Sequence, residues 1–130
     1  MGLNHEQLDK KKAEVVKNAS TDHLGLEEIV HLTNRIGMEY VEAKKNAELL
    51  ELLKPTVRAR IMQRYDDGTM SESKLKRITE SDPEYIENLR QLIEAKSKAE
   101  QLKIRYDSYK NLFEAKRSLL SYQKAEMNLI

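Results

Sequence analysis

The segment VRARIMQRYDDG, residues 57–68, decides the fold, because it ends one long helix and then turns the chain. Val57, Ile61 and Tyr65 lie at positions i, i+4 and i+8 and therefore form one stripe on a helix. The Asp-Asp-Gly sequence that follows is a turn signal, since Gly68 adopts a left-handed conformation at little cost. The segment predicts a helix that stops here and a chain that reverses direction.

Upstream of this segment, apolar residues recur at helical spacing and predict a helix over about 22–66. Ser20-Thr21-Asp22 offers side-chain oxygens for its N-cap. Pro55 has no N–H to donate to the carbonyl four residues earlier, so we expect the helix to kink or restart there. The expected apolar stripe contains Ile29, Val30, Ile36, Tyr40, Val41, Ala47, Leu50 and Leu53.

Downstream, two Ser/Thr-x-x-Glu patterns have the spacing of capping boxes, which mark helix starts. The first, residues 69–72, predicts a short helix to about residue 79. The second, residues 81–84, carries proline in the first turn, where a missing N–H costs nothing, and opens a helix over about 82–130. No segment alternates with period two. The predicted fold is therefore all-α: a long helical hairpin with a short helix in its connecting loop and a short N-terminal helix at residues 1–20.

The last helix is longer than a compact domain of this size requires. Its roughly 45 residues extend about 68 Å at 1.5 Å per residue, so we expect it to pair with the first helix and its excess to meet another subunit. Lys96, Lys116 and Gln123 fall in its seam, a pattern that more often specifies register and oligomeric state than it adds stability. The chain is therefore predicted to be a homo-oligomer whose contacts include Tyr109, Phe113, Leu120, Met127 and Ile130.

The composition fits one helical domain over residues 1–130. Charged residues make up 35% of the chain, with only two prolines and four glycines, a profile typical of long exposed helices. The absence of cysteine excludes disulfides and thiolate metal sites. No apolar run approaches the length of a membrane span. We expect a soluble, cytoplasmic protein.

Positive charge is concentrated in the middle of the chain, although the formal net charge is only +1. Residues 54–77 hold seven Lys or Arg against three Asp or Glu. Arg60 and Arg64 are like charges one turn apart, which cost a helix roughly 0.2–0.5 kcal/mol unless an anion lies across them. A basic groove with an aromatic side chain is what single-stranded DNA binding without sequence preference requires. The residues predicted to bind DNA are Arg58, Arg60, Arg64, Tyr65, Lys74, Lys76 and Arg77.

Two other features of this segment leave alternatives open. Cations suit the C-terminus of a helix, so the same residues fit a solvated helix end. Asp66 and Asp67 are candidate partners of Arg64 that would weaken the positive patch.

Catalytic and metal-binding patterns are nearly absent. His23, Glu27 and His31 are spaced to share one helix face, but zinc sites usually draw ligands from more than one element, so a solvated face is the preferred interpretation. There is no glycine-rich phosphate loop and no Ser/His/Asp order. We expect neither an enzyme nor a cofactor or metal.

The order of these parts resembles the UvsY-type recombination mediators of tailed phages. Those proteins share a long helix ending in a Lys/Arg-Ala-Arg motif, an aromatic residue, a loop with glycine and a long C-terminal helix. The matching residues here are Arg58-Ala59-Arg60, Tyr65, Gly68 and the helix over 82–130. The resemblance covers residues 26–130 in architecture and only the short basic motif in residue identity.

The resemblance implies that Arg58 and Arg60 contact single-stranded DNA and that the C-terminal helices assemble a ring-like homo-oligomer. Mediators of this family load a RecA-like recombinase onto DNA covered by a single-strand-binding protein, in DNA recombination and repair. Those two proteins are therefore the implied partners, and a phage-encoded chain would act in the cytoplasm of its bacterial host. The sequence departs from the family pattern at Arg58, where lysine is typical, and at the acidic pair after Tyr65, so the path of the DNA stays open.

Another class of protein would use the same hairpin. A structural, assembly or chaperone-like protein, such as a phage scaffold, needs the helices and no DNA binding, and an inhibitor that uses the hairpin to bind a protein is a third possibility. DNA binding at moderate salt discriminates between the first two.

Overall fold

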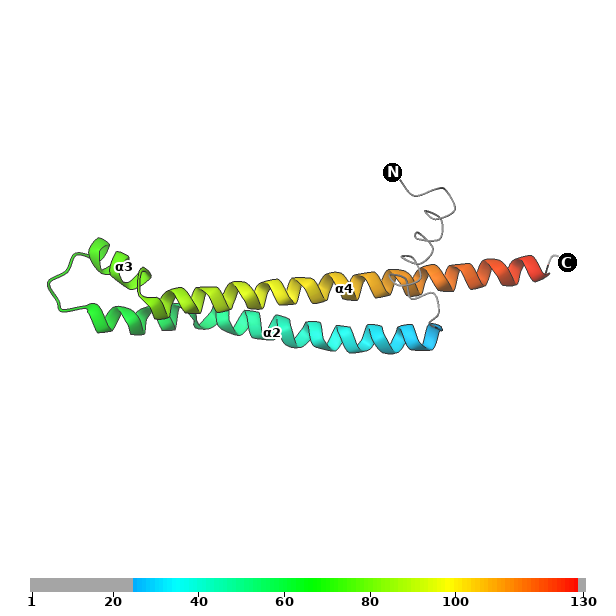
Figure 1. The fold of residues 1–130 in the computed structure, drawn as a ribbon, viewed down its shortest axis with the longest axis horizontal. Coiled ribbons are helices and arrows are strands. Elements are labelled where there is room, and N and C mark those ends of the chain that lie inside the picture. Colours follow the sequence, from blue (N-terminus) through cyan, green and yellow to red (C-terminus); the bar gives the residue numbers. More distant parts are fainter. Residues whose placement is uncertain (1–24, 129–130) are drawn as a thin grey trace, which may run out of the picture. The chain divides into compact units, whose positions relative to one another are not determined.

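The computed structural model of the chain describes residues 25–128, and within this range every regular element is a helix. The helices are α2 (Leu26–Tyr65), α3 (Glu72–Glu80) and α4 (Pro83–Asn128) (Figure 1). The all-α prediction is confirmed, with a long helix on each side of a short connecting helix. The predicted N-terminal helix at 1–20, and Ile130, lie outside the described residues.

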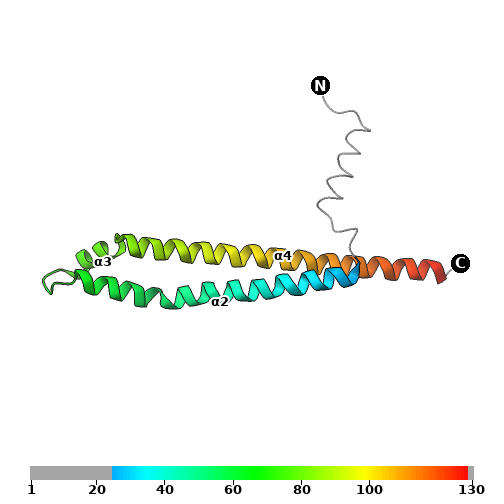
Figure 2. The same cartoon turned by 60° about the horizontal axis from the view of Figure 1, so that its bottom comes forward.

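The described chain divides into two units, each treated by itself below. One unit comprises residues 34–108, and the other comprises residues 25–33 together with 109–128. Within residues 34–108, α2 and α4 lie side by side and run in opposite directions, with α3 in the connection between them (Figures 1 and 2). This unit is the predicted helical hairpin.

Small side chains fill the seam of the hairpin. Ala43 on α2 and Ala99 and Leu102 on α4 form a buried cluster, and Tyr40 packs against it. Alanine leaves little between the helices, so their backbones approach closely. Gly37 leaves room for the Tyr106 ring, since a Cβ atom there would lie only 3.0 Å from Cε2 of that ring.

Helix α2 continues through Pro55 without interruption, so the chain does not restart there. Figure 2 shows α2 bending in its C-terminal half. A bend is expected, because proline cannot donate to the carbonyl of Glu51 and its ring crowds that carbonyl. The side chain of Glu51 instead reaches across the hairpin, where its Oε2 lies 2.8 Å from Nζ of Lys96. Lys96 is therefore an exposed cross-link and not a seam residue.

The sequence predicted the turn of the connection and the two helix caps, but it placed each cap one or two residues too early. Gly68 has φ +81°, the left-handed conformation expected of it. The N-cap of α3 is Ser71, whose hydroxyl accepts from the backbone N–H of Lys74, and not the predicted Thr69. Before α4, Asp82 Oδ1 accepts from the N–H of Glu84 at 2.8 Å, so Asp82 makes the cap contact predicted for Ser81. A carboxylate suits this position because the N-terminus of a helix is partially positive.

Helix α2 carries apolar side chains on two faces, whereas the sequence predicted one stripe. Ile36, Ala43 and Ala47 are buried against the rest of the hairpin. Val41 and Leu53, which were assigned to the same stripe, are instead exposed. The predicted stripe therefore combined two faces of the helix.

Candidate nucleic-acid interface at the end of the hairpin

Four of the seven predicted DNA-binding residues lie in the last two turns of α2, and three lie on α3. Ile61 is fully buried beneath this part of α2, while Val57 and Tyr65 are half-buried. The predicted stripe of these three residues is confirmed. Burial of one face directs the arginines that flank the stripe toward solvent and toward the start of α4.

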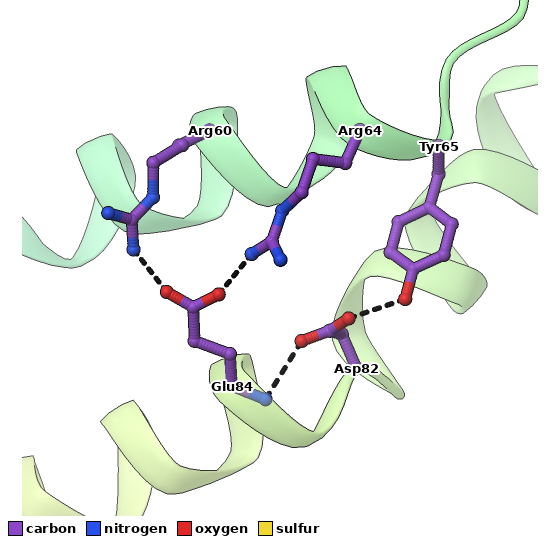
Figure 3. Close-up of polar contacts among 5 residues, drawn as sticks. All are labelled: Arg60, Arg64, Tyr65, Asp82 and Glu84. Atoms are coloured by element: carbon purple, nitrogen blue, oxygen red, sulfur yellow. Dashed lines mark hydrogen bonds and ion pairs between the residues drawn. The ribbon is translucent and has the colours of Figure 1, made fainter.

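Arg60 and Arg64 hold one carboxylate between them. An Nη2 of each guanidinium donates to a different oxygen of Glu84, Arg60 to Oε1 and Arg64 to Oε2 (Figure 3). The hydrogen bond that Arg64 donates to Glu84 raises the pKa of Arg64. The sequence predicted an anion across this arginine pair, and in the structure that anion is a side chain of the same chain. Both arginine side chains remain largely accessible, at 62% and 52% exposure.

Tyr65 makes a second contact between α2 and the start of α4. Its hydroxyl donates to Oδ2 of Asp82 at 2.5 Å (Figure 3). This hydrogen bond lowers the pKa of Asp82 and raises the pKa of Tyr65. Asp82 is 7% exposed and both of its oxygens are engaged. The hydroxyl of Tyr65 is therefore committed to the fold, while its ring is half-buried.

Arg58 is the third arginine with an acidic partner, since its Nη2 lies 3.5 Å from Oε1 of Glu80 at the end of α3. Arg77 donates from Nε to the carbonyl of Ser73 at 3.4 Å. Lys74 and Lys76 are exposed, and among residues 25–128 neither side chain has an ion-pair or hydrogen-bond partner. These two lysines on α3 are the predicted site residues that are most available to an external anion.

The acidic pair in the loop does not neutralise Arg64. Asp66 Oδ1 accepts from the N–H of Gly68, and Asp67 Oδ1 accepts from the N–H and hydroxyl of Thr69. The bonds from Thr69 lower the pKa of Asp67. Both carboxylates therefore shape the turn, and the suggestion that they pair with Arg64 was wrong.

The carboxylates that contact the arginines and Tyr65 lie just beyond the basic segment at 54–77. Glu80, Asp82 and Glu84 follow it directly and offset three of its four excess positive charges. The sequence offered one signal for them, the Ser81–Glu84 pattern, which assigned Glu84 to capping. Glu84 also faces the end of α2, and the sequence did not predict its contact with Arg60 and Arg64.

Four of the five predicted self-association residues lie in the other unit, residues 25–33 and 109–128, and the fifth, Ile130, lies outside the described residues. Tyr109 and Phe113 are half-buried, whereas Leu120 and Met127 are exposed. Every residue from 117 to 128 is exposed, although the segment is helical.

The described part of the chain offers neither a metal site nor a membrane span. His23 lies outside it, and residues 25–128 contain no cluster of three or more His, Asp or Glu side chains able to hold a metal ion. Over the same residues, none of the helices combines the length and apolar character needed to span a membrane.

Comparisons with protein families, with characterised proteins and with solved structures found no match to this chain. The resemblance to UvsY-type mediators therefore depends on the Arg58-Ala59-Arg60 motif and on the order of the helices.

Proposed function

We propose that this protein is a recombination mediator: a self-associating helical hairpin that binds single-stranded DNA without sequence preference and helps to load a RecA-like recombinase. The observation that carries the proposal is the arginine pair at the end of α2, which grips a carboxylate with one donor from each guanidinium. Guanidinium groups bind phosphate and carboxylate oxygens with the same geometry. A DNA phosphate is therefore a chemically equivalent guest for Arg60 and Arg64.

Glu84 gives this site a weak and reversible character. A phosphate that binds the arginine pair displaces Glu84, so part of the binding free energy is offset by the lost internal ion pair. The exposed lysines of α3, Lys74 and Lys76, have no such internal competitor among the described residues. Weak sites suit a mediator, because a recombinase must take over the DNA from it, and several copies in one oligomer provide avidity. The single-strand-binding protein and the recombinase are the expected partners on that DNA.

Fluorescence anisotropy with a labelled oligonucleotide across a salt series tests the DNA-binding proposal. The double change Arg60→Ala, Arg64→Ala removes up to two phosphate contacts, so the slope of log K against log salt is expected to flatten by up to about 1.4 for a single strand. Lys103→Ala, Arg105→Ala is the matched control, since it removes the same charge from exposed positions elsewhere on α4. Equal affinities for the parent and the arginine variant at every salt concentration would contradict the proposal.

A second function, that of a structural or assembly protein without DNA binding, is favoured by a different observation. All three arginines at the end of α2 already have carboxylate partners within the chain, so the fold uses them as cross-links. Under this alternative the parent protein shows no binding to the oligonucleotide at moderate salt, and Lys74→Ala, Lys76→Ala changes nothing.

A further inference from the structure

Within the hairpin, α2 exposes a row of apolar side chains on the face turned away from α4. Met38, Val41, Leu49 and Leu52 are each 51–75% exposed. Together with Lys45 they follow one another at spacings of three and four, so they share one helix face. The buried seam residues of α2, such as Ala43 and Ala47, lie on the opposite face.

Helix α4 has a matching outer row over the same unit. Ile86, Ile93 and Ile104 are 53–67% exposed. Glu100 falls on the same face, because it lies seven residues after Ile93 and four before Ile104. Arg90, between Ile86 and Ile93, pairs with Glu87 and Glu94 on its own helix. Each helix of the hairpin therefore carries an uncovered apolar row with a further charge near its middle, Lys45 on α2 and Glu100 on α4. Among residues 25–128 neither of these charges has an ion-pair partner.

The register of the hairpin places these two rows at the same levels. Because the helices are antiparallel, each residue further along α2 is level with one residue earlier on α4. Counted from the Glu51–Lys96 ion pair, Lys45 is level with residue 102. Counted from the Gly37–Tyr106 contact, it is level with residue 98. Glu100 lies midway between these two positions. The same construction places Leu52 level with Ile93 and Val41 level with Ile104.

We propose that a second copy of this chain packs beside the first in the same orientation, with the outer face of α2 on one copy against the outer face of α4 on the next. With the copies level, Lys45 meets Glu100 of the neighbour, Leu52 meets its Ile93 and Val41 meets its Ile104. The contact covers both apolar rows and pairs both lone charges. It is head-to-tail, so one copy of each pair keeps its α4 face free and the other keeps its α2 face free, and the arrangement continues into a ring or a row.

A two-fold contact between α2 and a second α2 fits the same side chains less well. The antiparallel register that sets Met38 against Leu52 and Val41 against Leu49 also sets Lys45 against its own copy. Like charges in the centre of an interface oppose association. Charge complementarity therefore selects α4 of the neighbour as the occupant.

This interface specifies the surfaces of the self-assembly on which the proposed function rests. Copies that share one orientation gather their Arg60 and Arg64 pairs at one end of the assembly. One strand of DNA then meets several sites at once, which raises avidity without any additional contact on a single subunit.

Charge reversal and charge exchange test the pairing in sedimentation velocity experiments on the full chain. Lys45→Glu and Glu100→Lys are each expected to weaken self-association by at least about tenfold, because each places like charges within the contact. The exchange Lys45→Glu, Glu100→Lys is expected to restore the parent's assembly. Lys98→Glu, on the flank of α4, is the control and leaves assembly unchanged. A monomeric parent at micromolar concentration, single variants that assemble like the parent, or an exchange variant that stays dissociated would each overturn the proposal.

Cross-linking distinguishes the two interfaces, and the absence of native cysteine makes it specific. Mixing Leu52→Cys protein with Ile93→Cys protein under oxidising conditions is expected to give a disulfide-linked heterodimer. A dominant product from Met38→Cys mixed with Leu52→Cys would overturn the proposal in favour of the two-fold contact. Assembly is measured without DNA, so a failed assembly test does not contradict the DNA-binding proposal. A failed DNA-binding test likewise does not contradict the proposed interface.

Discussion

Truncating Ile61 and Leu52 to alanine is expected to have opposite effects on folding and on assembly, although both residues are aliphatic and lie on α2. Ile61 is fully buried beneath the arginine pair, whereas Leu52 is 75% exposed on the outer face. Ile61→Ala removes three buried carbon groups, worth about 0.8 kcal/mol each, and leaves a cavity that adds to the loss. Alanine recovers a few tenths of a kcal/mol through its higher helix propensity. The expected loss in the free energy of unfolding is about 2–4 kcal/mol.

Leu52→Ala is the matched comparison, because it shortens a side chain that the hairpin does not bury. Its expected effect on unfolding of the dissociated chain is within about 0.5 kcal/mol, while its effect on assembly is a loss of apolar contact with the next copy. Urea denaturation followed by far-ultraviolet circular dichroism, at one fixed protein concentration below the association range, measures the first quantity. Sedimentation at higher concentration measures the second.

Two outcomes would refute this reasoning. A loss below about 1 kcal/mol for Ile61→Ala would mean that the end of the hairpin is not held by packing under the arginines. Equal losses for the two variants would mean that the buried and exposed faces of α2 are not distinct in the dissociated protein. Ile61→Val, which removes one carbon and is expected to cost about 0.5–1.5 kcal/mol, provides an intermediate point on the same scale.

Four further predictions concern the connection, the seam, the Tyr65–Asp82 bond and the C-terminal segment. Gly68→Ala is expected to destabilise the fold by about 1–2 kcal/mol, since φ of Gly68 is +81°. Gly37→Val is expected to destabilise it by about 1–3 kcal/mol, since the valine side chain meets the Tyr106 ring. Urea titrations measure both losses, and Gly25→Ala, which has open space around it, is the control. The Tyr65–Asp82 bond contributes stability between two limits of pH. The pKa of Asp82 is lowered from 3.8, so its contribution is lost as the pH falls through the lowered value. The pKa of Tyr65 is raised from 10.0, so its contribution is lost as the pH rises through the raised value. Denaturation midpoints measured across pH should lose the alkaline dependence in Tyr65→Phe and keep a weaker acid dependence, because backbone N–H groups also lower the pKa of Asp82. A parent profile identical to that of Tyr65→Phe would contradict the assignment. Deleting residues 119–130 should give smaller particles in light scattering, because it removes exposed apolar side chains from the end of α4, and unchanged particle size would argue against self-association there.

The sequence alone determined the features that depend on residues a few positions apart. Gly68 ends the turn because only its own backbone conformation matters there, and Pro83 opens α4 because a first-turn residue needs no N–H. Helical spacing likewise identified the two long helices and the stripe of Val57, Ile61 and Tyr65. The residues of the candidate DNA site were chosen at this level, from charge and spacing, and their role in binding stays a prediction.

The tertiary structure decided which side chains meet across the hairpin. Glu84 meets Arg60 and Arg64 because the start of α4 lies beside the end of α2, and no local sequence pattern encodes that placement. The division of α2 into two apolar faces also depends on α4, since Val41 and Ala43 are both apolar in sequence and only the position of the partner helix buries one and exposes the other. Local signals fix helix starts and ends through hydrogen bonds within one turn, whereas partner choice and burial depend on packing between segments far apart in the chain.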